Sequence, residues 1–334
     1  MKALVYTGPR ALEFRDAPPP LPESEEGEDE IVVDVEACGI CGSDMHAYFG
    51  HDARRPAPLI LGHEVCGIAR GGAYDGARVA VNPLVTCMSC PACLAGRTNL
   101  CPKRQIISMP PREGGFAEQV RLPERNLLSV PDGVTCEIAA LTEPVAVAWH
   151  GCNLAERTLL RPLAACDVLV IGGGAIGVAA SDILTARSVA TLKIAETNEG
   201  RRHAVAGHGR RDTFDPVANP GDENTADLVI DDVGIASTRS YACHAARPGG
   251  VIVHLGLGSA EGGIDVRKLT LQEITFLGAY TYTMTDFAET LEALANDRLG
   301  PIDWTEQRAL ADGAAAFAAL ADVSVATPKV ILRP

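Results

Sequence analysis

Four closely spaced cysteines constrain this chain more than any other feature of its sequence. Cys87, Cys90, Cys93 and Cys101 follow a C-x2-C-x2-C-x7-C pattern. Loops of this length let neighbouring thiolates share one tetrahedral Zn²⁺ ion, while the residues between them provide little apolar core. Four reduced thiols without a metal would leave the segment with nothing to organise it. The spacing therefore predicts a structural zinc site in a lobe of about residues 82–115.

The composition limits the compartment and the partners. The opening residues, MKALVYTGPR, lack the apolar segment of a signal peptide, and no uninterrupted apolar run reaches about 18 residues. We expect a cytoplasmic protein without a membrane partner, whose eleven cysteines, an odd number, stay reduced. The formal net charge of −14 argues against nucleic acid as a partner.

The length of 334 residues suggests about two domains, and the pattern along the chain divides into three parts. Residues 1–145 hold short strand-like runs separated by Pro- and Gly-rich turns, with an exposed acidic loop at 18–30. Residues 146–283 alternate helices with five apolar runs typical of buried parallel strands. From 284 onward two helices and a closing strand follow. The sequence thus predicts an α/β chain with a doubly wound parallel sheet in its middle.

A glycine-rich turn in the middle part indicates a dinucleotide site. The segment DVLVIGGGAIGVAASDIL places a G-x-G-x-x-G pattern directly after an apolar strand and at the start of a helix. The glycines allow a tight turn, close approach of the backbone to a pyrophosphate, and close packing of helix on strand. The helix N-terminus then favours the phosphate charges. The residues expected to bind the cofactor here are Gly172, Gly174, Ala175, Ile176 and Gly177.

Two kinds of residue bear on which dinucleotide binds. Glu196 lies 19 residues beyond Gly177, at the end of the second strand, where an acid binds ribose hydroxyls and repels a 2′-phosphate. It favours NAD over NADP. Arg201, with its neighbour Arg202, points the other way, because an arginine near this position accommodates a 2′-phosphate. We predict NAD as the cofactor, with NADP as the alternative.

A third group of residues has the composition of a catalytic metal site. CGICGSDMH contributes Cys41, LGHE contributes His63 and Glu64, and LTEPVAV contributes Glu143. Three protein ligands and one open position are the arrangement of a catalytic zinc. Each residue alone has an ordinary structural explanation; Cys41, for example, suits a buried packing position. The combination with a four-cysteine lobe and a glycine turn favours a metal centre.

These motifs together resemble the zinc-dependent medium-chain dehydrogenases/reductases, of the alcohol and sorbitol dehydrogenase kind. The similarity runs nearly end to end, through CGICGSDMH, LGHEVCG, the cysteine lobe, GGFAEQV, EPVAVAWHG, VIGGGAIG, RPGGVIVHLGL and KVILRP. It implies a β-rich GroES-like catalytic domain made by residues 1–145 and 284–334, and an inserted Rossmann domain over 146–283. It also implies Cys41 and His63 as ligands of a catalytic zinc, so that each subunit would hold two zinc ions.

The resemblance is strongest to one branch of that family. An acid at Glu143, where liver-type alcohol dehydrogenases have a cysteine, resembles the polyol, threonine and sugar dehydrogenases. Either Glu64 or Glu143 could touch the metal; we expect Cys41, His63 and Glu64 at rest, with Glu143 close by or exchanging. Ser43 and His46 resemble the family's proton relay toward solvent. Asp44 would fix the tautomer of His63, or alternatively cap a helix.

The implied activity is hydride transfer from a secondary alcohol or polyol to NAD. A sugar (aldose) dehydrogenase or a threonine-type dehydrogenase would share every motif, whereas a nucleotide-binding protein without turnover would not need Cys41 and His63. Thr281 stands where sorbitol dehydrogenases carry an arginine, although Tyr282 is retained, so sorbitol itself is in doubt. The run EITFLGAY would join two subunits edge to edge, giving a homodimer or a homotetramer.

Overall fold

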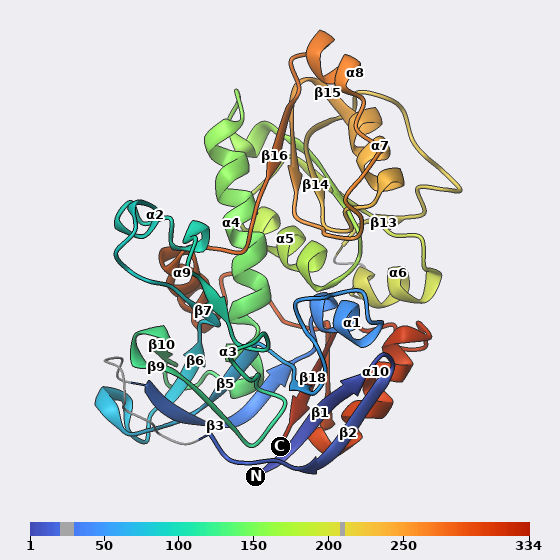
Figure 1. The fold of residues 1–334 in the computed structure, drawn as a ribbon. Helices are drawn as coiled ribbons and strands as arrows, with labels where there is room; N and C mark the ends of the chain where they lie inside the picture. The colour runs from blue at the N-terminus through green and yellow to red at the C-terminus, as the bar shows by residue number, and fades with distance from the viewer. Residues whose placement is uncertain (21–29, 208–210) are drawn as a thin grey trace.

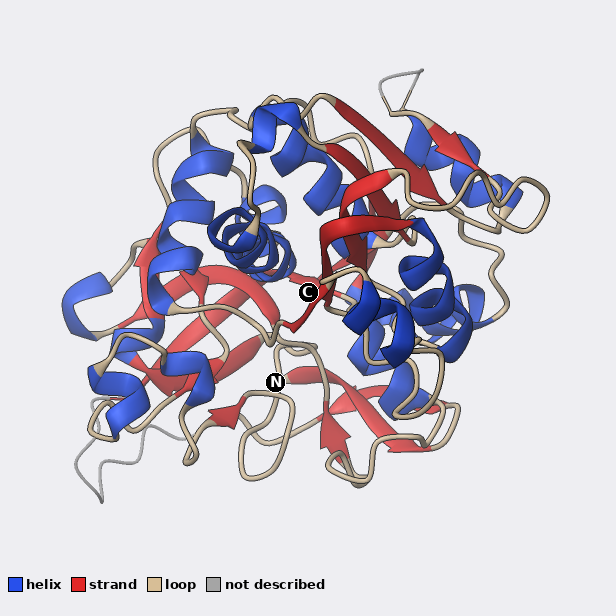
Figure 2. Ribbon diagram, turned by 90° about the horizontal axis from the view of Figure 1, so that it is seen from above, coloured by secondary structure: helices blue, strands red, loops and turns tan. Residues whose placement is uncertain are grey.

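The computed structural model describes residues 1–20, 30–207 and 211–334. Most of the predicted acidic loop, residues 21–29, lies outside these ranges. Within them, no helix is long and apolar enough to cross a membrane. The two chain ends lie beside each other in the β-rich part of the molecule (Figure 1, Figure 2).

The β-rich part is built from both ends of the chain. A seven-stranded sheet has the order β10-β6-β5-β3-β18-β17, with β9 also paired to β3. Its strands are β3 (Glu30–Gly39), β5 (Glu64–Arg70), β6 (Arg78–Val81), β9 (Gln119–Pro123), β10 (Leu127–Ser129), β17 (Thr305–Ala309) and β18 (Lys329–Arg333). A three-stranded sheet, β2-β1-β4, packs nearby and comprises β2 (Ala11–Asp16), β1 (Lys2–Gly8) and β4 (Leu59–Ile60). The predicted closing strand is confirmed: β18 pairs with β3, setting Leu332 opposite Cys38.

The middle of the chain forms the predicted doubly wound sheet. Its order is β13-β12-β11-β14-β15-β16, and every pairing is parallel. The strands are β11 (Asp167–Ile171), β12 (Thr191–Ala195), β13 (Thr213–Phe214), β14 (Ala226–Asp231), β15 (Ala246–His254) and β16 (Thr275–Gly278). This is the Rossmann order 3-2-1-4-5-6, in which the strand order reverses between β11 and β14. Ligands bind outside the carboxyl ends of the strands at that reversal.

Helices cover both faces of this sheet (Figure 1). Val168 and Val170 of β11 belong to one core, with helices α4 (Thr142–Thr158) and α5 (Ala175–Ala186), whereas Leu169 and Ile171 face a second core with α7 (Ala236–Ala245). This alternation follows from the two-residue period of a strand. The remaining helices of this part are α6 (Glu199–Ala206) and α8 (Val266–Leu271).

Two of the predicted buried strands are less covered than expected. The outer half of β12 is largely exposed, and β16 is half-buried along its length. The reason is their position in the sheet. Only the two-residue β13 lies beyond β12, and β16 is the last strand of the order, so neither is enclosed as β14 is.

The junctions between the two parts are helical. Helix α4 begins inside the β-rich part and shares a core with α9 (Met284–Ala295), one of the two helices predicted for the tail. The other is α10 (Gly313–Ala321). The predicted boundary at residue 145 falls within α4. The short helices α1 (Gly42–Tyr48), α2 (Pro91–Leu94) and α3 (Cys136–Ala140) complete the β-rich part.

A buried ion pair on α5 also binds the segment that precedes β17. Arg211 donates from Nε and Nη2 to both oxygens of Asp182 on α5, each at 2.9 Å. Trp304, in the segment before β17, donates to the same carboxylate at 3.2 Å. All three side chains are buried. A bidentate pair in this environment holds its partners in a fixed orientation.

We expect Arg211→Ala to lower the free energy of unfolding by about 3–5 kcal/mol, because the variant removes a buried cation that is shared by the carboxylates of Asp182 and Asp303. Urea denaturation would measure the loss. The control is Arg15→Ala, which removes an exposed pair with Glu13 and should cost no more than about 1 kcal/mol. Equal losses in the two variants would contradict the assigned role.

Candidate active site and metal centres

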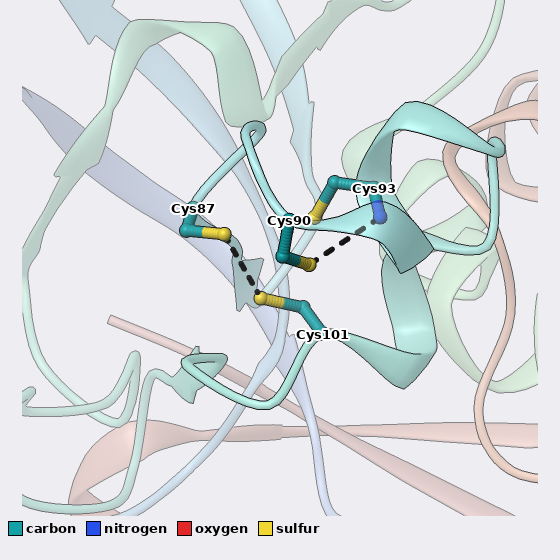
Figure 3. A group of neighbouring side chains, drawn as sticks. All are labelled: Cys87, Cys90, Cys93 and Cys101. Atoms are coloured by element: carbon teal, nitrogen blue, oxygen red, sulfur yellow. Dashed lines mark hydrogen bonds between the residues drawn. The ribbon is translucent and has the colours of Figure 1, made fainter.

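The four cysteines of the lobe converge on one point. They lie between the short strands β7 (Leu84–Val85) and β8 (Gln105–Ile106), and their sulfur atoms are all within 4.8 Å of one another (Figure 3). The Sγ atoms of Cys87 and Cys101 are 3.5 Å apart, and all eleven cysteines of the chain are free thiols. A tetrahedron with Zn–S bonds of about 2.3 Å has S–S edges of about 3.8 Å. The donor set therefore fits one zinc ion.

Local hydrogen bonds favour the thiolate form of Cys87, whereas burial and the neighbouring cysteines raise the pKa of the Cys93 thiol to about 11. The backbone N–H and the hydroxyl of Ser89 lower the pKa of the Cys87 thiol to about 6. Cys90 is the N-cap of α2, and its Sγ accepts a hydrogen bond from the Cys93 N–H at 3.5 Å. Both interactions place positive partial charge beside sulfur, and the deprotonated ligand is thereby stabilised.

The lobe also holds the segment that follows β16. Asn99 donates from Nδ2 to the carbonyl oxygen of Tyr280 at 2.8 Å. The Arg104 guanidinium lies 4.7 Å from the centre of the Tyr280 ring and donates to its hydroxyl at 3.3 Å. Two contacts from one lobe thus fix the backbone and the ring of a single residue.

A second cluster combines Cys41, His63 and Glu64. One donor atom from each lies within 4.8 Å of the other two. Cys41 follows β3 as the N-cap of α1, and Glu64 begins β5, which pairs with β3 so that Glu64 is opposite Gly39. A Cβ on Gly39 would lie 1.9 Å from Glu64 Oε2. Glycine at 39 therefore makes room for this carboxylate.

The His63 ring is held from its Nδ1 side. Asp44 is fully buried, and its Oδ1 is 3.5 Å from Nδ1, while Ser108 Oγ is 3.4 Å from the same atom. Asp44 Oδ2 also accepts from the Cys41 backbone N–H at 3.0 Å. The two roles considered for Asp44 are thus combined, since it caps α1 and faces His63. Partners on Nδ1 leave Nε2 available as the ligand atom.

Glu64 has a partner that the sequence did not reveal. Lys329 on β18 approaches the two Glu64 oxygens at 2.5 and 2.8 Å and donates to the carbonyl of Ile40 at 2.9 Å. Both charged side chains are buried. Burial disfavours the lysine cation, but Glu64 outweighs it and raises the pKa of Lys329. The signal was present in the sequence as one lysine directly before the apolar run Val330, Ile331 and Leu332.

Glu143 lies close to this cluster without joining the three converging donors. It lies in the first turn of α4, is buried, and accepts a hydrogen bond from the Tyr282 hydroxyl at 2.9 Å on Oε1. Burial raises the pKa of Glu143 to about 7, although the neighbouring His63 acts in the opposite direction. Whether Glu64 or Glu143 completes the ligand set stays a prediction.

The two expected relay residues have different surroundings. Ser43 Oγ accepts from Arg55 Nη2 at 3.4 Å, and the Ser43 carbonyl accepts from Nη1 at 3.1 Å. The ring of His46 lies 6.5 Å from that of His51, centre to centre. Their part in proton transfer stays a prediction.

The glycine turn has the expected strand–turn–helix geometry. Gly172 has a φ of +111°, and helix α5 begins at Ala175 with Gly174 as its N-cap. A Cβ on Gly177 would lie 2.1 Å from the Gly172 carbonyl oxygen, so the helix packs closely on the strand. Because glycine has no side chain to cap α5, the backbone N–H groups of Ala175 and Ile176 at its start remain for an anion.

Glu196 borders the same turn. Its Oε2 accepts from the Gly173 N–H at 2.9 Å and its Oε1 accepts from the Asn198 N–H at 2.8 Å. Arg201 Nη1 is 3.8 Å from Oε2, whereas Arg202 donates to the carbonyl oxygens of Glu196 and Thr197. Of the two arginines, Arg201 is therefore the one whose charge faces the Glu196 carboxylate.

Comparison with known proteins identifies both halves. Residues 27–132 match the alcohol dehydrogenase GroES-like domain, and residues 174–296 match the zinc-binding dehydrogenase domain. The chain is 32% identical over 313 residues to L-galactonate-5-dehydrogenase of Escherichia coli strain K12, covering 90% of this chain and 88% of that protein.

Two solved structures extend the similarity to cofactor complexes. Acetophenone reductase from Geotrichum candidum, in complex with NAD, superposes with a TM-score of 0.86 at 27% identity, covering 100% of this chain and 97% of that one. A protein of Sinorhizobium meliloti assigned as a zinc-binding dehydrogenase, bound to NADP, has a TM-score of 0.84 at 27% identity, with 100% and 99% coverage.

We expect Cys101→Ser to remove about one zinc equivalent per chain and to lower the thermal midpoint of unfolding, because a lobe without an apolar core depends on its metal. Elemental analysis and a thermal melt would measure the two effects. Cys243→Ser, at a buried cysteine of α7 outside both clusters, is the control and should keep the full zinc content. Unchanged zinc in Cys101→Ser would refute the assignment of the lobe.

Proposed function

The chain belongs to the zinc-binding alcohol dehydrogenase family, and from that premise we propose that it transfers hydride from a secondary alcohol of a polyol to NAD. The observation that carries the proposal is the convergence of Cys41, His63 and Glu64 in a chain that also has a Rossmann glycine turn. A soft thiolate, an imidazole and a carboxylate suit a catalytic zinc site. A zinc ion held there would act as a Lewis acid that lowers the pKa of a substrate hydroxyl, while NAD would accept the hydride.

The residues around the cluster have separate tasks in this proposal. Asp44 and Ser108 hold His63 in orientation, and Lys329 offsets the negative charge of Glu64. The Tyr282 hydroxyl fixes Oε1 of Glu143 and so sets the direction of the second carboxylate. Ser43 and His46, beyond Cys41, would pass a proton toward solvent.

The substrate class follows from the residue that replaces the arginine of sorbitol dehydrogenases. Thr281 is neutral, and its buried Oγ1 has no hydrogen-bond partner among the described residues. A neutral side chain at this position suits an uncharged polyhydroxy substrate better than a phosphorylated one. L-Galactonate, the sugar acid in the name of one relative, carries a negative charge, so comparing it with neutral polyols tests this preference directly. Sugar or threonine-type oxidation is the alternative activity.

NAD is favoured over NADP because the Glu196 carboxylate is fixed at the end of β12, where it would repel a 2′-phosphate. Arg201 is paired with this carboxylate in the present arrangement. Because the two related structures hold different dinucleotides, the choice requires a direct measurement.

The activity test follows absorbance at 340 nm in zinc-loaded protein with NAD⁺ or NADP⁺. The panel contains polyols, sugars, L-galactonate, simple alcohols and L-threonine. We expect turnover of a polyol with NAD⁺, reduced by more than about 100-fold in Cys41→Ser, since loss of an outer-shell partner alone costs 10–100-fold. Cys243→Ser should retain activity. Preference for NADP⁺ would overturn the role of Glu196, and inactivity across the panel would exclude these substrate classes.

We also propose a homodimer, or a tetramer of dimers, formed through β16. This strand ends the sheet order and is half-buried, so its free edge can pair with a second copy. Exposed Leu257 and Leu271 lie in the segment between β15 and β16. Light scattering at micromolar concentration should give a dimeric or tetrameric mass; a monomeric mass would contradict this assembly.

A further inference from the structure

An acidic side chain lies inside the glycine turn. Asp232 directly follows β14, and its Oδ2 accepts a hydrogen bond from the Gly177 N–H at 2.7 Å. A Cβ built on Gly172 would lie 1.7 Å from Asp232 Oδ1, and one built on Gly174 would lie 3.6 Å from Oδ2. The carboxyl group thus occupies space that the glycines leave open.

The second oxygen of this carboxyl group has no partner in the described part of the chain. Asp232 Oδ1 is screened from solvent and makes no hydrogen bond to any described residue. A buried carboxyl oxygen without a partner is costly, so such an atom beside a ligand-binding turn indicates a partner that arrives with the ligand. A protonated carboxyl could donate from this position, whereas a carboxylate could only accept.

The charges around Asp232 come from three elements. Asp231 precedes it on β14, Glu196 approaches from the end of β12, and Arg201 approaches from α6. Burial raises the pKa of Asp232 to about 7; the Gly177 N–H and Arg201 lower it, while Asp231 and Glu196 raise it further. Near neutral pH the group therefore exists in both protonation states.

The expected ligand brings negative charge to the same place. The N–H groups of the first turn of α5, a helix of 12 residues, would receive a pyrophosphate, and Asp232 already uses the N–H of Gly177. An ionised carboxylate beside a pyrophosphate is a like-charge contact in a partly desolvated site, whereas the neutral acid is not.

We propose that Asp232 couples dinucleotide binding to proton uptake, so that the chain with a neutral Asp232 binds the pyrophosphate and the chain with an ionised Asp232 repels it. This inference rests on the proposed function, because it assigns a role within the dinucleotide site. It makes Asp232 a pH-dependent determinant of cofactor affinity.

The direction of the pH dependence follows from linkage. If the ligand binds the protonated form, affinity is constant well below the pKa of the free chain and falls as pH rises through it. With that pKa near 7, the dissociation constant should increase by about tenfold between pH 6 and pH 8.

Calorimetry with ADP-ribose tests this coupling in the zinc-loaded protein, because ADP-ribose carries the pyrophosphate but no nicotinamide. We expect about tenfold weaker binding at pH 8 than at pH 6. Titrations in buffers of different ionisation enthalpy should show uptake of about half a proton per ligand at pH 7, rising toward about one proton at pH 8. Adenosine, which lacks phosphate, should bind with an affinity that hardly depends on pH.

Asp232→Asn is the matched variant, since an amide can still accept from the Gly177 N–H but does not titrate. It should bind ADP-ribose with nearly equal affinity at both pH values. Asp222→Asn, at an exposed acid of the same part, should keep the wild-type pH dependence. Proton uptake in the wild-type protein tests the coupling even if the Asp232 variant does not fold.

Three results would count against the proposal. Equal ADP-ribose affinity at pH 6 and pH 8 in the wild type would overturn the coupling while leaving the dinucleotide site intact. An undiminished pH dependence in Asp232→Asn would assign the proton to another group. Absence of ADP-ribose binding at every pH would refute the dinucleotide site itself, and the coupling with it.

Discussion

The buried pair between Lys329 and Glu64 is the interaction on which the rest of the β-rich part depends. It joins the last strand to β5 across 265 residues of sequence, in the same place where Cys41 and His63 meet Glu64. Removing one partner of such a pair costs about 3–5 kcal/mol, because the other charge stays buried. The same ion pair therefore attaches the last strand to β5 and offsets the negative charge of Glu64 beside Cys41 and His63. A cation beside Glu64 also reduces the charge that the carboxylate presents to a metal.

The two cysteine-containing clusters are connected by a short, strained segment. The lobe holds Tyr280 through Asn99, and two residues later Tyr282 reaches Glu143. Between them Thr281 adopts a φ of +47°, a conformation that costs a β-branched residue about 1–3 kcal/mol. Such a backbone persists only if both flanks are fixed. By holding Tyr280, the lobe therefore also helps to fix the direction of the Tyr282 hydroxyl.

Features encoded locally could be predicted from the sequence, and features produced by long-range packing could not. The cysteine spacing and the strand–glycine–helix segment are short patterns whose geometry follows from a few neighbouring residues. Lys329 appeared only as a charge beside a short apolar run, because its partner Glu64 belongs to a distant segment. The position of Asp232 in the glycine turn could not be predicted, since sequence periodicity does not show that the carboxyl end of β14 lies over the turn after β11. The exposure of β12 likewise depends on the sheet order rather than on its own residues.

Acidic residues gather where the strand order reverses, although this edge of the sheet is expected to bind a negatively charged pyrophosphate. Glu196, Asp231 and Asp232 all follow or end strands there, and Arg201 offsets only part of their charge. Asp231 is used by the backbone N–H groups of Val233 and Gly234, and Glu196 by those of Gly173 and Asn198. Asp232 differs because its Oδ1 has no hydrogen-bond partner among the residues that the structure describes. Two of the three acids therefore order the loops of the crevice, and the third is left to respond to an anionic ligand.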